Sequence, residues 1–120
     1  MSGPASRIRV RNADSVTEVE FLDRNILDEA YIHAIGDEIA SIIEASPSPR
    51  LLLSFKGVEH LSSAALGTLI TINNRIRSRS GQLRLAEIDP QILEVFVITK
   101  LNRIFQIHET CEDARKSFTS

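Results

Sequence analysis

The stretch from Leu51 to Arg79 constrains the fold more than any other part of the chain. Its first five residues, Leu51–Phe55, are apolar on both faces of a strand except at one serine, which is typical of a central strand covered by helices on both sides. From Ser63 the apolar residues recur at spacings of three and four, which predicts an amphipathic helix to about Arg79. Ser62 and Ser63 therefore lie where a buried strand gives way to a long helix.

The rest of the chain alternates between the periods of strands and of helices. Strands are predicted at Arg7–Arg11, Val16–Leu22, Gln82–Ile88 and Ile104–His108, and further helices at Asp28–Ala45, Pro90–Thr99 and Cys111–Phe118. Leu22–Leu27 is predicted to be a connecting loop and Gly81 to be a helix C-cap. Arginines on the first strand and glutamates on the second are expected to pair across a hairpin.

The order of elements, β-β-α-β-α-β-α-β-α, predicts an α/β fold with a mostly parallel or mixed sheet of about five strands and helices packed against it. A length of 120 residues suits a single domain, 1–120, with an ordered core at about residues 7–118. A hydrophobic content of 42% is enough for one real core. We expect a monomer or a weak dimer.

Charge and composition exclude several classes of protein. A formal net charge of -2 argues against a nucleic-acid-binding domain, which needs a basic excess. The single Cys111 excludes an intramolecular disulfide and has no neighbouring cluster of metal ligands, so no metal and no cofactor are expected. No segment approaches the ~18 consecutive apolar residues of a membrane span. The expectation is a cytoplasmic protein that does not insert into membranes.

The serine pair admits two interpretations. Either serine could be an N-cap, one of the commonest uses of serine, which stabilises a helix by about 1 kcal/mol. Alternatively, Ser63 is exposed at the start of the helix and accepts a phosphoryl group, where unpaired backbone N–H groups and the helix dipole favour negative charge. The effect of that charge would then fall on a protein docked over this surface.

An enzymatic role is not expected. His60 lies three residues before Ser63, but the serine is not flanked by the glycines of a nucleophile elbow. Gly57 and Gly67 do not form a phosphate-binding loop, because the lysine-bearing pattern of such loops is absent. The acidic residues are scattered and form no paired-carboxylate arrangement.

The segment LLLSFKGVEHLSSAALGTL, residues 51–69, resembles the signature of STAS domains, the fold of bacterial anti-sigma factor antagonists. The similarity extends over about residues 7–118, including RSRSGQLRLAEIDPQILEVFVITKLNRIFQIHETCEDARKSF in the second half. The resemblance implies a protein that is phosphorylated by an anti-sigma factor with serine kinase activity. The unphosphorylated form would bind that anti-sigma factor and free the sigma factor.

Residue by residue, the family's phosphorylated serine matches Ser63, with Ser62 as an alternative acceptor. The family usually carries Asp-Ser-Ser/Thr-Gly-Leu-Gly here. This chain has Ser62 at the Asp position, and alanines at 64 and 65. The residues expected to bind the partner protein are His60, Ser62, Ser63, Ala64, Leu66 and Gly67.

Two further readings remain open. The absent Asp suggests a STAS module that acts as a constitutive scaffold or accessory subunit of a signalling or transport complex, without a phosphorylation switch. Nucleotide binding is a weaker third option, which no motif in the sequence supports.

Overall fold

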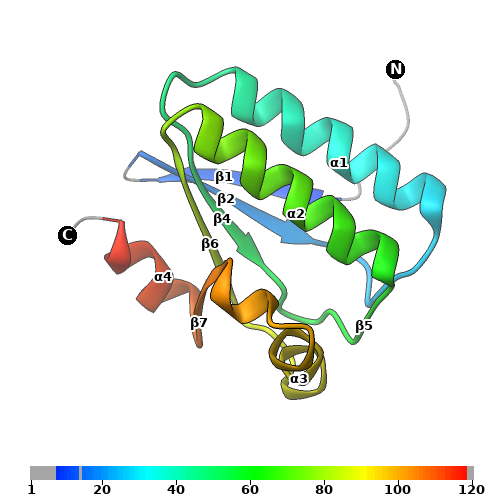
Figure 1. Cartoon of the computed structure of the whole chain (residues 1–120). Coiled ribbons are helices and arrows are strands. Elements are labelled where there is room, and N and C mark those ends of the chain that lie inside the picture. Colours follow the sequence, from blue (N-terminus) through cyan, green and yellow to red (C-terminus); the bar gives the residue numbers. More distant parts are fainter. Residues whose placement is uncertain (1–7, 14, 119–120) are drawn as a thin grey trace.

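A five-stranded sheet in the order β1-β2-β4-β6-β7 forms the centre of the molecule (Figure 1). The computed structural model describes residues 8–13 and 15–118, so Arg7, predicted to start the first strand and the ordered core, lies outside the described residues. The strands are β1 (Ile8–Ala13), β2 (Val16–Phe21), β4 (Arg50–Ser54), β6 (Gln82–Ala86) and β7 (Gln106–His108). β1 and β2 are antiparallel and the other pairs parallel, which confirms the predicted mixed sheet with β4 at its centre.

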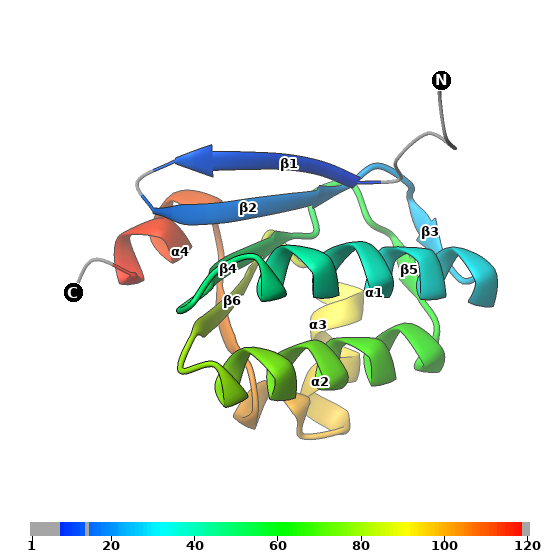
Figure 2. The ribbon, with the colours of Figure 1, turned by 90° about the horizontal axis from the view of Figure 1, so that it is seen from above.

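The helices cover both faces of this sheet. They are α1 (Glu29–Glu44), α2 (Ser63–Ser78), α3 (Pro90–Ile98), the 3₁₀ helix η1 (Leu101–Arg103) and α4 (Cys111–Ser117). α1 and α2 lie side by side along one face (Figures 1 and 2). Leu51 and Leu53 join the main core beneath these helices, while Leu52 joins a second cluster with Ala114 of α4 and Phe118, which follows α4. This two-sided burial explains why β4 is apolar on both faces.

Ion pairs flank α4 on its side of the sheet. Arg9 pairs with Glu20 across the β1–β2 hairpin at 3.2 Å, which confirms the predicted pairing of arginines with glutamates for these two residues. Glu18 instead pairs with Arg115 of α4 at 2.5 Å. These side chains are partly exposed, so each pair contributes less than about 1 kcal/mol. The second face of the sheet is therefore apolar only where α4 covers it.

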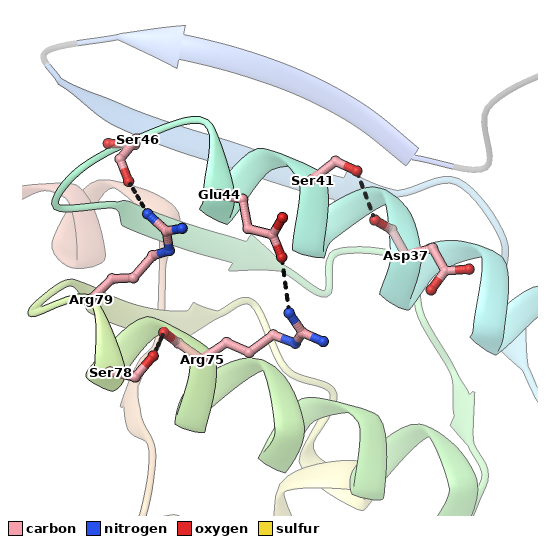
Figure 3. Close-up of polar contacts among 7 residues, drawn as sticks. All are labelled: Asp37, Ser41, Glu44, Ser46, Arg75, Ser78 and Arg79. Carbon is pink, nitrogen blue, oxygen red and sulfur yellow. Dashed lines mark hydrogen bonds and ion pairs between the residues drawn. The ribbon is translucent and has the colours of Figure 1, made fainter.

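Polar contacts join the C-terminal ends of α1 and α2 (Figure 3). Arg75 of α2 donates a hydrogen bond of 3.0 Å to Glu44 at the end of α1. Arg79 donates to the backbone oxygen of Ser46 in the loop that follows, at 3.4 Å. The serine pair lies at the N-terminal end of α2, so these contacts are at the opposite end of the helix.

Two glycines allow the backbone to approach neighbouring groups closely. A Cβ on Gly36 would lie 3.2 Å from Cγ2 of Thr68, which agrees with close packing of α1 on α2. A Cβ on Gly81 would lie 2.4 Å from the backbone oxygen of Pro49. The prediction that Gly81 is the residue capping α2 was wrong, because Ser80 adopts the left-handed conformation, with φ of 57°. Gly81 follows it and donates to the carbonyl of Ile76 at 2.9 Å, as in a Schellman motif.

The prediction of a plain loop at Leu22–Leu27 was also wrong. Within this segment Asn25–Ile26 forms the short strand β3, which pairs in parallel with β5 (His60–Leu61). A two-residue strand is too short for the alternation of polar and apolar residues that identifies strands in a sequence. The predicted element order consequently lacks β3 and β5.

The last strand starts later than predicted. β7 begins at Gln106 rather than at Ile104, because η1 and its closing turn occupy the preceding residues. Phe105 in this turn is buried, and its ring centroid lies 5.9 Å from that of Phe96 in α3. The apolar residues that suggested a longer strand therefore include Phe105, which packs against α3 in the core.

Candidate functional site

A tight turn leads the chain from β4 toward the serine pair. The backbone N–H of Val58 donates to the carbonyl of Phe55 at 3.0 Å, and Gly57 has a φ of 84°. This positive φ is favourable for glycine because glycine has no Cβ. The turn directs the chain away from the end of the sheet and into β5.

Arg24, the residue before β3, and Ile26 within β3 hold the next part of the junction. The N–H groups of Glu59 and His60 donate to the carbonyl of Arg24 at 2.7 and 3.2 Å. The N–H of Ser62 donates to the carbonyl of Ile26 at 3.1 Å. The residues immediately before α2 are therefore held by three backbone hydrogen bonds that they donate to the segment around β3, more than 30 residues earlier in the sequence. The position of the serine pair depends on this small sheet.

Ser62 is the N-cap of α2. Its backbone is extended, with φ of −84° and ψ of 166°, and its hydroxyl oxygen accepts a hydrogen bond of 3.2 Å from the N–H of Ala65. Ser62 is half-buried. The N-cap interpretation of the serine pair is therefore confirmed for Ser62, which uses its hydroxyl to stabilise the helix.

Ser63 differs from Ser62 because it is exposed and is the first residue of α2. The backbone N–H groups of Ser63 and Ala64 donate to no atom of the described chain. The first turn of α2 contains no acidic side chain that would neutralise the positive end of the helix dipole. An anionic group on the Ser63 hydroxyl would meet this field at close range.

A groove lies beside the start of α2 and brings some of the predicted residues together. It includes His60 and Leu66 from the sequence prediction, and residues of α3 that the sequence prediction missed. Its lining residues are Glu59, His60, Leu61, Leu66, Gln91, Ile92 and Val95. Val95 is 42% exposed, so this side of the groove presents an apolar side chain to solvent. One sequence feature could have indicated that α3 lines a binding surface: the helix has more apolar residues than are needed to cover one buried face.

Four predicted residues do not line this groove: Ser62 and Ser63, which open α2, and Ala64 and Gly67. Ala64 and Gly67 are both exposed, and their carbonyls accept hydrogen bonds from the hydroxyls of Thr68 and Thr71. A Cβ on Gly67 would meet no atom within 4 Å. These two residues belong to the outer surface of α2.

Metal-ligand clusters and a hydrogen-bonded histidine–serine pair were both looked for in the described residues. Between residues 8 and 118, Asp14 apart, no group of three or more His, Cys, Asp or Glu side chains is placed to hold a metal ion. Within the described residues, no hydrogen bond joins His60 to Ser62 or Ser63. Among these described helices, none has both the length and the apolar character needed to cross a membrane.

We expect Cys111 to be a slow nucleophile. Burial raises the pKa of its thiol above the ordinary 9.0, an effect that a hydrogen bond with Ser54 partly offsets. The reactive thiolate is therefore less populated in the folded chain near pH 8 than after unfolding. Alkylation by iodoacetamide, followed by mass spectrometry, should be slower in buffer than in denaturing urea. Equal rates would contradict this prediction.

The same pKa shift predicts a dependence of stability on pH. A raised pKa means that the folded chain binds the thiol proton more tightly than the unfolded chain does. The contribution of Cys111 is therefore complete below pH 9.0 and is lost as the pH rises through the higher pKa of the folded form. Urea titrations of the native chain and of Cys111→Ser between pH 8 and pH 11 should show that the native chain loses more stability.

Replacing Ser62 by alanine should lower the free energy of unfolding by about 1 kcal/mol, because the cap to Ala65 is lost. The matched control is Ser63→Ala. It should change stability by less than about 0.5 kcal/mol, since Ser63 is exposed and donates or accepts no capping bond. Urea denaturation of both variants measures the difference. A larger cost at Ser63 than at Ser62 would contradict the capping assignment.

Comparison with known proteins identifies similar chains. The family model of the STAS domain matches residues 14–114. BtrV of Bordetella bronchiseptica, named as an anti-sigma factor antagonist, is 25% identical over 95 residues, which cover 79% of this chain and 81% of BtrV.

Solved structures share the fold. An anti-sigma factor antagonist (STAS) domain protein of Planctomyces limnophilus superposes with a TM-score of 0.87 at 22% identity, over 94% of this chain and 98% of that one. The Bacillus cell fate determinant SpoIIAA in its phosphorylated form gives a TM-score of 0.69 at 13% identity, over 92% and 98% of the two chains.

Proposed function

Because the chain belongs to the STAS domain family, we propose that it is an anti-sigma factor antagonist that works by binding a protein and is switched by phosphorylation of Ser63. The observation that carries this proposal is the position of Ser63, which is exposed as the first residue of α2 and lies next to unpaired backbone N–H groups. The name of BtrV and the phosphorylated state of SpoIIAA are consistent with the proposal. The protein would act in the cytoplasm and without catalysis of its own.

The proposed switch is electrostatic. A kinase transfers the γ-phosphoryl group of ATP to the hydroxyl oxygen of Ser63, with release of ADP and of the hydroxyl proton. The phosphate adds about −1.5 to −2 charges at neutral pH. The dipole of α2 and the free N–H groups of Ser63 and Ala64 favour this charge within the protein itself. An anti-sigma factor docked over both the groove at His60 and Leu66 and the exposed start of α2 would have to accommodate the same charge in its interface. Phosphorylation would therefore release the complex while leaving the fold intact.

The geometry favours Ser63 over Ser62 as the acceptor. Ser62 is half-buried and its hydroxyl is engaged with the N–H of Ala65. A kinase would have to break this cap and expose the side chain before transfer. Ser63 requires neither step, and its hydroxyl forms no hydrogen bond in the described chain.

Phosphorylation is tested with the cognate anti-sigma kinase, ATP and mass spectrometry. The expected result is one phosphate on the native chain and on Ser62→Ala, and none on Ser63→Ala. Phosphate on Ser62 alone would show that Ser62, and not Ser63, is the acceptor. Absence of phosphate from both serines would refute the switch.

A constitutive scaffold is the second candidate, and the observation that favours it is Ser62 at the position where the family usually has an acidic residue. A scaffold would remain unphosphorylated and would assemble into complexes of many copies or with other subunits. Light scattering after size-exclusion chromatography separates the candidates, because the switch hypothesis requires no assembly beyond the chain and its anti-sigma factor.

A further inference from the structure

The outer surface of α3 is unusually apolar for a helix in contact with water. Six of its nine residues, Pro90–Ile98, are large and apolar, but only Ile92 and Phe96 are buried. Val97 is 53% exposed, and Ile98 at 71% is the most exposed of the large apolar side chains in the described chain. Exposed apolar side chains that gather on one helix are typical of a surface that binds another protein. Another surface is therefore expected to cover the outer face of α3.

A hollow next to this face has the same apolar character. It runs between α3 and the edge strand β7, and it is lined by Ile88, Pro90, Leu93, Val97, Asn102, Ile107, His108 and Glu109. The surface thus combines a projecting side chain, Ile98, with an apolar hollow on the flank of the same helix. Such a surface is complementary to itself, since two copies related by a two-fold axis can each place Ile98 against the hollow of the other.

The charges on this surface are also self-complementary. Glu94 lies three residues before Val97, and Lys100 lies three residues after it. Both are exposed, and neither forms an ion pair within the described part of the chain. Lys100 follows the end of α3, where its backbone is left-handed. In an antiparallel pair of α3 helices centred near Val97, Glu94 of each copy and Lys100 of the other would lie at the same end of the pair. This pairing occurs twice and specifies the antiparallel arrangement.

We propose that a second copy of this chain covers α3, forming a two-fold dimer in which the two α3 helices pack antiparallel. One helix pair with its adjoining hollows buries less than the roughly 1,200–2,000 Å² of standard stable interfaces, so the dimer dissociates readily on dilution. The dimer surface differs from the groove at the serine pair. Val95 faces that groove, whereas Val97 lies about 200° further around α3 and lines the hollow beside β7.

Sedimentation equilibrium of the full chain, over a range of concentrations from micromolar to millimolar, tests the proposal. The average mass of the native chain should rise from one copy toward two. Ile98→Glu should remain at one copy throughout, because the new carboxylate would be buried against an apolar hollow. The matched control is Leu22→Glu, which replaces a side chain that is 48% exposed outside α3 and should dimerise like the native chain.

Charge reversal tests the antiparallel arrangement. Glu94→Lys and Lys100→Glu should each weaken association by about tenfold, because each places like charges opposite one another twice. The double variant should recover the association of the native chain. A native chain that stays monomeric at millimolar concentration would overturn the proposal. So would dimerisation that Ile98→Glu leaves unchanged, or a double variant as weak as the singles. The proposed switch can be tested independently of the dimer by measuring phosphorylation of Ser63 in the Ile98→Glu variant.

Discussion

Ser63→Asp is expected to bind the anti-sigma partner about tenfold more weakly than the native chain, a difference of about 1.4 kcal/mol. Ser63→Ala is expected to bind with an affinity within about twofold of native. The aspartate places a negative charge where the docked protein must bury it or face it, whereas alanine removes only an exposed hydroxyl. Isothermal titration with the purified anti-sigma factor measures both affinities.

The same aspartate should stabilise the isolated protein. α2 has no acidic residue in its first turn, so a carboxylate at Ser63 interacts favourably with the dipole and contributes about 0.3–1 kcal/mol. Weaker binding by a more stable protein could not be attributed to unfolding. The two measurements together therefore separate a charge effect at the interface from damage to the fold.

Thr71→Asp is the matched control for charge. Thr71 is exposed on the same helix, eight residues or about 12 Å along its axis from Ser63. This variant has the same net charge as Ser63→Asp but should bind the anti-sigma factor with near-native affinity. Equal affinities for Ser63→Asp and Ser63→Ala would rule out switching by charge.

Gly81→Ala should be among the most destabilising single changes in the chain, with a loss of about 2–4 kcal/mol. The added Cβ would lie 2.4 Å from the backbone oxygen of Pro49 and 2.8 Å from its Cγ. These atoms belong to a buried proline and to backbone, so they cannot move aside as a flexible side chain would. The N–H of Gln82 also donates to this oxygen at 2.8 Å, so the start of β6 would be displaced.

Gly67→Ala is the matched control, and we expect it to change the free energy of unfolding in the opposite direction from Gly81→Ala. A Cβ at Gly67 meets no atom within 4 Å, and alanine is favoured over glycine inside a helix by about 1 kcal/mol. Gly67→Ala should therefore raise the free energy of unfolding, while Gly81→Ala lowers it. A neutral Gly81→Ala would show that the chain can separate Pro49 from Gly81 without cost.

The agreement between predicted and observed elements has a local cause. The helix predicted from Asp28 is found as α1, because Asp28 accepts a hydrogen bond from the N–H of Tyr31 at 3.0 Å. The helix after Asp89 begins in the same way, with Asp89 accepting from Gln91 at 2.9 Å. Caps and periodicity are properties of a few neighbouring residues, so a single sequence displays them.

The candidate site was predictable only in part. The sequence placed Ser62 and Ser63 at the start of a helix but left open which serine caps it. That assignment requires the backbone path through the junction, which is fixed by the carbonyls of Ile26 in β3 and of Arg24 just before it. Val95 was missed for a similar reason, since its position beside His60 depends on how α3 packs.

The sequence by itself determined the strand, turn and helix between Leu51 and Ser78, and the α/β order around them, because hydrophobic periodicity and capping act over short distances along the chain. Only the tertiary structure decided that Ser62 caps α2 while Ser63 remains exposed, and that α3 forms one wall of the groove beside them. Those features depend on contacts between residues that lie far apart in the sequence. Their energies are set by packing and hydrogen bonding across the fold, which local patterns do not record.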